Sequence, residues 1–181
     1  AWEIENGAMV IVLEVGNHQM GASLGTRRTF DDFHLHIEFR LPLLPENTDQ
    51  RRGNSGVIIE DFQFFEVQVL DTYGLPGYYD ECGAIYQTAP PKVNMCLPPL
   101  QWQSYDITWK APRFDRQGNL TQAPRITVDH NGVRIHRNLE LPYSDNAVRT
   151  RRQRPDLRRP GRIKLQDHGY PVEYRNIWMV E

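Results

Sequence analysis

The residues best suited to chemistry lie in one short segment, 65–71, which reads Phe-Glu-Val-Gln-Val-Leu-Asp. Its alternation is typical of a β-strand and puts Glu66 and Gln68 on one face, about 7 Å apart. Asp71 has the wrong parity for that face, but one extra residue in a β-bulge, with Leu70 as the candidate, would return it there. Two carboxylates and an amide on one sheet face indicate either a polar site on a rigid support or an ordinary solvated face.

Two further segments carry polar groups beside glycines. In segment 52–56, Arg-Gly-Asn-Ser-Gly, the glycines permit a tight backbone path that could present Arg52 and Asn54 to a hydroxylated ligand. The same composition also makes ordinary turns. Glu81 and Tyr86 flank a Cys-Gly-Ala-Ile run and place functional groups at a strand end or in a turn.

The histidine with the clearest catalytic character is His168, beside Asp167 and two residues after Gln166 in a glycine-bounded turn. Histidine titrates near neutrality, so it can accept or donate a proton, or ligate a metal. A capped turn histidine is the alternative. The strand that follows carries Arg175, with a change of register expected near Asn176.

Segment 33–40 alternates apolar residues with His34, His36, Glu38 and Arg40. His-x-His with a nearby glutamate can bind a divalent metal, as in cupin jelly rolls. The spacing differs from the cupin pattern. This difference favours a polar face with a Glu–Arg pair over a metal site.

The two cysteines, Cys82 and Cys96, lack the C-x-x-C spacing of metal or redox sites. A disulfide between them would close a short loop, worth about 3 kcal/mol. We favour two free buried thiols, which behave as small hydrophobes.

The elements that must position these groups are short strands with almost no helical periodicity. They indicate an all-β fold, a jelly-roll sandwich of two antiparallel sheets. Asn131-Gly132 predicts a hairpin turn. The candidate strands are 9–14, 33–41, 56–59, 64–70, 84–86, 103–110, 125–128, 133–137, 161–166 and 172–180.

Composition sets broad limits on function. The 181 residues, 39% hydrophobic and 24% charged, predict one domain spanning residues 1–181. A formal net charge of -2 argues against a dedicated nucleic-acid binder. The arginine-rich stretch from Arg149 to Arg162 is best explained as a solvated loop, since no aromatic residues are interleaved for base stacking. No apolar run approaches the ~20 residues of a membrane span.

Five motifs together resemble a known family, the 3-keto-disaccharide hydrolase domain. The resemblance extends over nearly the whole chain, and the motifs are specific as an ordered set. They are Arg-Gly-Asn-Ser-Gly (52–56), Phe-Glu-Val-Gln-Val-Leu-Asp (65–71), Cys-Gly-Ala-Ile-Tyr (82–86), Leu-Gln-Asp-His-Gly (165–169) and Tyr-Arg-Asn-Ile (174–177).

The resemblance implies a concanavalin A-like sandwich that acts on glycosides already oxidised at C3 by a separate sugar oxidoreductase. The C3 ketone acidifies the proton on C2. A base removes that proton, the enolate expels the aglycone from C1 by β-elimination, and water can then add to the enone. It also implies a location in the bacterial periplasm or outside the cell, although we find no signal peptide.

Roles follow from the resemblance as hypotheses. Glu66 or His168 is the base, and Asp71 and Glu81 are candidates for the acid. A divalent metal is one option for the cofactor, with Glu66, Asp71 and His168 as candidate ligands. The expected substrate-binding residues are Arg52, Asn54, Gln68, Tyr86, Gln166 and Arg175.

Three alternatives remain open. Segment 66–71 is similar to the E-x-D-x-x-E signature of laminarinase-like glycosidases, although Gln68 and Asp71 depart from it and retaining chemistry wants its carboxyls ~5–5.5 Å apart. A non-catalytic carbohydrate-binding module shares the fold. A cupin-like metal enzyme rests on His34 and His36 alone.

Overall fold

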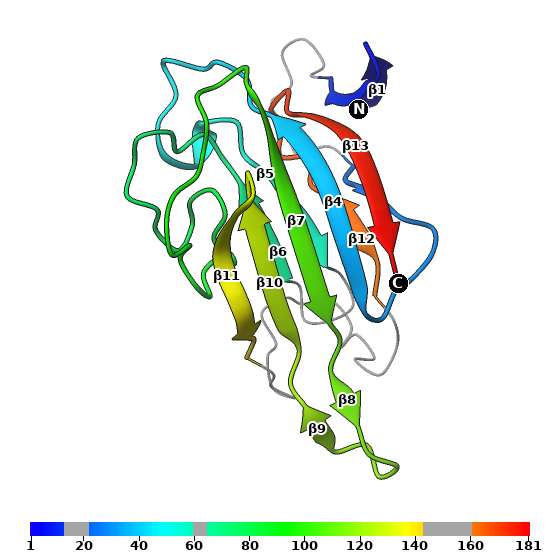
Figure 1. Ribbon diagram of the computed structural model, residues 1–181. Coiled ribbons are helices and arrows are strands. Elements are labelled where there is room, and N and C mark those ends of the chain that lie inside the picture. The colour runs from blue at the N-terminus through cyan, green and yellow to red at the C-terminus, as the bar shows by residue number, and fades with distance from the viewer. Residues whose placement is uncertain (13–21, 60–64, 143–160) are drawn as a thin grey trace.

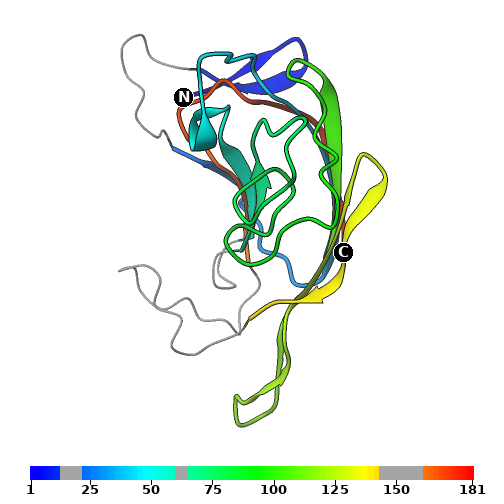
Figure 2. The ribbon, with the colours of Figure 1, turned by 90° about the vertical axis from the view of Figure 1, so that its left-hand side faces the viewer.

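The chain folds into two antiparallel β-sheets that pack face to face (Figures 1 and 2). This computed structural model describes residues 1–12, 22–59, 65–142 and 161–181. Within these ranges the only helical element is a single 3-10 turn, η1, at Asp49–Arg51, and no helix is long and apolar enough to cross a membrane. The predicted all-β sandwich is therefore confirmed.

Seven strands form the larger sheet, in the order β1-β2-β13-β4-β7-β10-β11, and four form the smaller one, in the order β3-β12-β5-β6. A separate two-stranded ribbon, β8–β9, extends from one end (Figure 1). The strands are β1 Trp2–Glu5, β2 Ala8–Ile11, β3 Leu24–Gly25, β4 Phe33–Arg40, β5 Ser55–Ile59, β6 Phe65–Val69, β7 Trp102–Lys110, β8 Arg113–Phe114, β9 Leu120–Gln122, β10 Arg125–His130, β11 Val133–Glu140, β12 Ile163–Leu165 and β13 Glu173–Val180.

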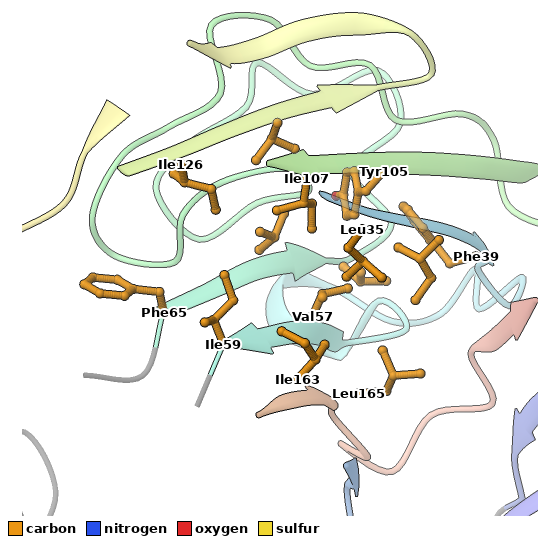
Figure 3. Close-up of a cluster of buried hydrophobic side chains, with 14 of the residues drawn as sticks. Leu35, Phe39, Val57, Ile59, Phe65, Tyr105, Ile107, Ile126, Ile163 and Leu165 are labelled. Carbon is orange, nitrogen blue, oxygen red and sulfur yellow. The ribbon is translucent and has the colours of Figure 1, made fainter. Parts of the chain in front are cut away.

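The hydrophobic core lies between the two sheets (Figure 3). Strands β4, β7 and β10 of the larger sheet bury alternate residues, as the period of two in a strand requires. The smaller sheet contributes the facing layer, which includes Val57, Ile59, Phe65, Ile163 and Leu165 (Figure 3). The polar residues that alternate with this layer must point away from the core, on the outer face of the smaller sheet.

Most sequence-predicted strands coincide with β2, β4 to β7 and β10 to β13. The predicted hairpin is confirmed, since Asn131 and Gly132 both have positive φ between β10 and β11. The register change near Asn176 is also confirmed, because the ladder between β13 and β4 shifts there. The short strands β1, β3, β8 and β9 were not predicted, and most of the arginine-rich stretch lies outside the described residues.

Segment 82–96 closes one side of the sandwich. It follows the free edge of β6, where Gly83 N donates to Gln68 O and Tyr86 N donates to Glu66 O. It also reaches β11, where the backbone N of Lys92 donates to the Ile135 carbonyl. Figure 2 looks onto these green loops, which cover the open side between the sheets. The predicted strand 84–86 is reduced to isolated bridges at Ile85.

Candidate active site

The outer face of the smaller sheet carries Glu66 and Gln68, side by side on β6. The alternate residues Phe65, Val67 and Val69 enter the core, so the strand parity predicted from the sequence is confirmed. Yet both polar side chains are buried, with exposed fractions of 5% for Glu66 and 1% for Gln68. A solvated sheet face is therefore excluded, and the pair is a buried polar cluster.

Gly56 makes room for the Glu66 carboxylate. It lies opposite Gln68 in the ladder between β5 and β6. A Cβ added at Gly56 would stand 2.0 Å from Glu66 Oε1, where real Cβ contacts essentially never fall below 3.0 Å. The carboxylate thus lies directly over the Gly56 backbone, and any larger residue at this position would displace it.

Burial changes the ionisation of Glu66. Removing a carboxylate from water disfavours its charged form, and this raises the pKa of Glu66 to about 7. Among the described residues, no hydrogen bond to the carboxylate offsets this cost. A carboxyl group with a pKa near neutrality is matched to general acid–base work, because both protonation states are populated at the working pH.

Gln50, on the 3-10 turn η1, fixes the neighbouring amides. Its Oε1 accepts hydrogen bonds from Asn54 Nδ2 and Gln68 Nε2, each at 3.0 Å, and its Nε2 donates to Asp80 O at 2.8 Å. Asn54 is thereby joined to Gln68 through the Gln50 amide. Gln50 was not predicted from the sequence. The only sign of it there is that Gln50 stands two residues before the motif that begins at Arg52.

The chain continues the β12 ladder beyond Leu165 and brings Gln166 to the same face. Gln166 N donates to Gly56 O at 2.9 Å, and burial alternates from residue 163 to residue 169. This alternation puts His168 on the face of Gln166 as well, half-buried and stacked on Tyr170 with ring centroids 6.4 Å apart. Two sequence-predicted site residues are therefore brought to the Glu66 face.

Two amide oxygens on this face have no hydrogen-bond partner. They are Oε1 of Gln68 and Oε1 of Gln166, both buried, and the statement covers contacts within the described part of the chain. An unpaired buried acceptor is costly, and most such groups in folded proteins are satisfied. Hydroxyl groups of a bound ligand would satisfy both.

A cavity of about 440 Å³ adjoins the amide cluster. Arg52 and Glu81 meet across it, with Arg52 Nη2 3.8 Å from Glu81 Oε1. The other carboxylate oxygen of Glu81 accepts the backbone N–H groups of Gly77 and Tyr78, both at 2.9 Å. Glu81 therefore organises the loop. Its contacts favour this structural role over the expected role of a catalytic acid. The lining residues are Asn47, Thr48, Asp49, Gln50, Arg52, Leu75, Tyr78, Asp80 and Glu81.

Aromatic side chains border this region. Tyr86 follows the inward-facing Ile85 on the segment along the β6 edge, and its backbone N donates to Glu66 O at 2.9 Å. Tyr86 stands in a turn, and this hydrogen bond holds its backbone beside that of Glu66. Tyr78 lines the cavity and is exposed, although no pattern in the sequence marks it as a site residue.

Asp71 does not join the Glu66 carboxylate. The ladder between β5 and β6 is regular, β6 ends at Val69, and the bulge expected at Leu70 is not part of it. The Asp71 Oδ1 atom instead accepts the backbone N–H of Tyr73 at 3.2 Å, and the carboxylate opposes ionisation of the nearby Cys96 thiol. The second carboxylate of a retaining glycosidase is therefore not supplied by Asp71.

Arg175, an expected substrate-binding residue, lies in the larger sheet and not on the face that carries Glu66. On β13 it is exposed and pairs with Glu38, Nε to Oε2 2.6 Å apart, and its guanidinium lies 3.9 Å from the Trp102 ring centroid. These groups occupy the outer face of the larger sheet, and the core separates that face from the Glu66 face.

The outer face of the larger sheet also holds the His-x-His pair. His36 Nδ1 lies 2.8 Å from Asp106 Oδ1, and His34 Nδ1 lies 3.2 Å from Thr108 Oγ1. The expected polar face is confirmed, although Glu38 pairs with Arg175 rather than with Arg40, which pairs with Glu173.

Metal ligation is not supported by the described residues. Among them, no group of three or more histidine, cysteine, aspartate or glutamate side chains is placed to hold a metal ion. Glu66, Asp71 and His168, the candidate ligands, therefore do not converge, and the cupin-like arrangement around His34 and His36 is absent as well.

Comparison with known proteins agrees with this architecture. The sequence profile described as the 3-keto-alpha-glucoside-1,2-lyase-like domain matches residues 1–180. No curated protein matches the chain significantly. A crystal structure from Parabacteroides distasonis ATCC 8503, provisionally described as a glycosyl hydrolase, is 32% identical with a TM-score of 0.79, covering 99% of this chain and 74% of that one.

Two more distant structures share the fold. A second provisional glycosyl hydrolase from the same organism is 21% identical with a TM-score of 0.65, covering 99% of this chain and 89% of that one. An alginate lyase bound to an alginate trisaccharide is 10% identical with a TM-score of 0.53, covering 99% and 84%. Family and fold together support a carbohydrate-active enzyme. On the whole-length profile match, the chain belongs to the family of 3-keto-α-glucoside-1,2-lyase-like domains.

Proposed function

We propose that the protein cleaves glycosides oxidised at C3, by removing the C2 proton and eliminating the C1 aglycone. The observation that supports this most is the Glu66 carboxyl group, whose pKa is raised to about 7 on a buried face with unpaired amide acceptors. The family description, a 3-keto-alpha-glucoside-1,2-lyase-like domain, is compatible with a reaction of this class.

Glu66 is the proposed base. Its ionised form takes the proton from C2, which the adjacent ketone has made acidic, and the electron pair left on C2 delocalises onto the C3 oxygen as an enolate. The enolate then collapses to a C1–C2 double bond and expels the aglycone oxygen from C1. A carboxylate is strongly basic only when poorly solvated, so the burial that raises its pKa also suits it to this step.

The amides orient the sugar ring. Oε1 of Gln68 and Oε1 of Gln166 are the unpaired acceptors, so they would take hydrogen bonds from ring hydroxyls. Gln68 Nε2 donates to Gln50 Oε1, which fixes the Gln68 amide and leaves Gln68 Oε1 without a partner among the described residues. His168, on the same face, is the proposed acid that protonates the departing oxygen.

The cavity beside Gln50 is the proposed aglycone site. Arg52 and Glu81 offer hydrogen-bonding groups, and the exposed Tyr78 offers an aromatic ring on which a second sugar could stack. Such a substrate must be supplied by an enzyme that oxidises the C3 hydroxyl, which makes a sugar 3-oxidoreductase the expected upstream partner. Addition of water to the enone would give the 3-keto sugar.

The test compares a 3-keto-α-glucoside with its unoxidised parent, both carrying a chromogenic aglycone. Wild type should release aglycone from the keto compound alone, and kcat/KM should rise as pH increases through about 7, where Glu66 ionises. Glu66→Gln should lower kcat by at least ~100-fold. Deuterium at C2 should slow wild type, since C–H cleavage is the proposed step.

His168→Ala should reduce turnover of substrates with poor leaving groups more than of those with good ones. The matched control is Glu38→Gln, a carboxylate on the other sheet, which should leave turnover unchanged. Equal turnover of keto and unoxidised substrates, or full activity in Glu66→Gln, would contradict the proposal.

A further inference from the structure

The two cysteines of the chain lie together behind the candidate site. Cys82 and Cys96 are free, both are buried, and both belong to the core cluster. They bracket segment 82–96, which runs along the β6 edge and closes the side of the sandwich. No other cysteine occurs in the 181-residue sequence, so a disulfide within these residues must join these two.

Both sulfur atoms are anchored to the same stretch of backbone. Cys82 Sγ lies 3.2 Å from the hydroxyl of Tyr105, which donates to Gln68 O at 2.7 Å. Cys96 Sγ donates to Leu70 O at 3.6 Å. Gln68 and Leu70 are two residues apart on one extended segment, so the thiols meet against the core side of the residues that follow Glu66.

The thiols also interact directly. A hydrogen bond from Cys82 lowers the pKa of Cys96, whereas burial raises the pKa of Cys82. Cys96 is therefore the better nucleophile of the two, and it is also the more accessible, at 6% exposed against 0%. Thiol–disulfide exchange depends on the thiolate fraction of the attacking cysteine and on its accessibility, and both favour Cys96 as the first to react.

We propose that Cys82 and Cys96 form an intramolecular disulfide when the folded protein meets a thiol–disulfide exchange oxidant. The Cys96 thiolate attacks one sulfur of the oxidant's disulfide and releases one oxidant thiol. Cys82 loses its proton and attacks the Cys96 sulfur of the mixed disulfide, which releases the second oxidant thiol. Two protein thiols are oxidised and one oxidant disulfide is reduced.

The cross-link fixes the segment that supports the active-site strand. Between the two cysteines, Gly83 N donates to Gln68 O, Ala84 O accepts from Gln68 N, and Tyr86 N donates to Glu66 O. A disulfide closes this segment into a covalent loop, which restricts the unfolded chain and its local opening. The inference rests on the thiol geometry and is independent of the reaction proposed above.

The test treats the folded protein with oxidised glutathione and, in parallel, with a phosphine reductant. Oxidation should lower the intact mass by about 2 Da, yield a Cys82–Cys96 peptide, and raise the melting temperature by roughly 5–10 °C. Cys82→Ala and Cys96→Ala should show neither the mass loss nor a redox-dependent melting temperature.

Three results would overturn the proposal. One is two alkylatable thiols in oxidised wild type. Another is a disulfide-linked dimer on a non-reducing gel. The third is a cross-link that appears only in urea or that lowers the melting temperature. Because the readouts are mass and stability, they stand whatever the outcome of the turnover assays.

Discussion

At the scale of single residues, Gly56 and Glu66 act together. The buried carboxylate of Glu66 occupies the space that a side chain at position 56 would fill. The Cβ of an alanine at Gly56 would fall 2.0 Å from Glu66 Oε1. The carboxylate can escape that contact only by rotating out of its present position. The position of the proposed base is thus set by a residue that contributes no functional group.

We predict that Gly56→Ala lowers kcat by 10-fold to about 100-fold through displacement of the base, with little change in fold. Turnover of the keto-glucoside and far-ultraviolet circular dichroism measure the two effects. Gly25→Ala is the matched control, since Gly25 lies in the same sheet and its added Cβ meets only the Lys164 side chain and the carbonyl of Ile163, none closer than 3.3 Å. Equal losses in both variants would contradict the prediction.

Residue-level inference from the sequence succeeded where strand parity alone decides the outcome. Alternation in segment 65–69 places Glu66 and Gln68 on one face, and the structure agrees. Gln50 escaped notice because its contacts with Asn54 and Gln68 arise from the path of a 3-10 turn, which no period reveals.

Arg175 shows the other limit of sequence reasoning, at the scale of elements. Parity states which side of its own strand a residue occupies, but not to which sheet that strand belongs. β13 pairs with β2 and β4 in the larger sheet, so Arg175 faces away from the Glu66 site although its motif accompanies the site motifs in sequence.

Arg175→Ala should therefore leave kcat/KM for the keto-glucoside within about 2-fold of wild type. The lost ion pair with Glu38 is half-exposed, so its effect on stability should be below about 1 kcal/mol. Arg52→Ala, at the cavity, should raise KM. A large loss of turnover in Arg175→Ala alone would return this residue to the site.

The segment along the β6 edge depends on close packing at Gly83. Gly83 has φ of +79°, and a Cβ there would lie 2.7 Å from Cδ1 of Ile135 on β11. Gly74 has nearly the same φ, +76°, but its Cβ would meet nothing within 4 Å. The two glycines share the backbone cost of a left-handed conformation and differ in packing.

We expect Gly83→Ala to lower the free energy of unfolding by about 1–3 kcal/mol more than Gly74→Ala does, because overpacking adds to backbone strain. Urea unfolding of the two variants measures the difference. If both lose the same amount, the contact with Ile135 is not tight and the segment is held by its hydrogen bonds alone.

Two buried groups whose pKa values shift in opposite directions should determine how the stability of the whole molecule depends on pH. Burial raises the pKa of Glu66 from 4.5 to about 7, so folding loses stability as pH rises through that interval. Burial lowers the pKa of His130 from 6.5 to about 3, so folding loses stability as pH falls through that interval. At about 1.4 kcal/mol per pKa unit, the Glu66 effect is about 3 kcal/mol in total, and the His130 effect reaches a similar size by about pH 4.

In wild type, these two groups should make the free energy of unfolding depend only weakly on pH between pH 4 and pH 7, because their contributions oppose each other. The free energy of unfolding of Glu66→Gln, measured relative to wild type, should be about 3 kcal/mol higher at pH 8 than at pH 4. His130→Gln should lose the acid sensitivity and become more stable, relative to wild type, as pH falls from 6.5. Urea titrations at several pH values measure each difference, and parallel curves for wild type and Glu66→Gln would show that burial does not shift this carboxyl.

The order of strands has a consequence for how the molecule is made. β12 lies between β3 and β5 in the smaller sheet, and β13 lies between β2 and β4 in the larger one. The last two of the described strands therefore enter the interior of both sheets, and Gln166 and His168 reach the Glu66 face only with them. During synthesis, both sheets must wait with open edges until these strands leave the ribosome. Such long-range pairing is slow, and unpaired edges recruit other chains. The pairing of β12 and β13 should consequently complete the site and close the open sheet edges in the same late step of folding.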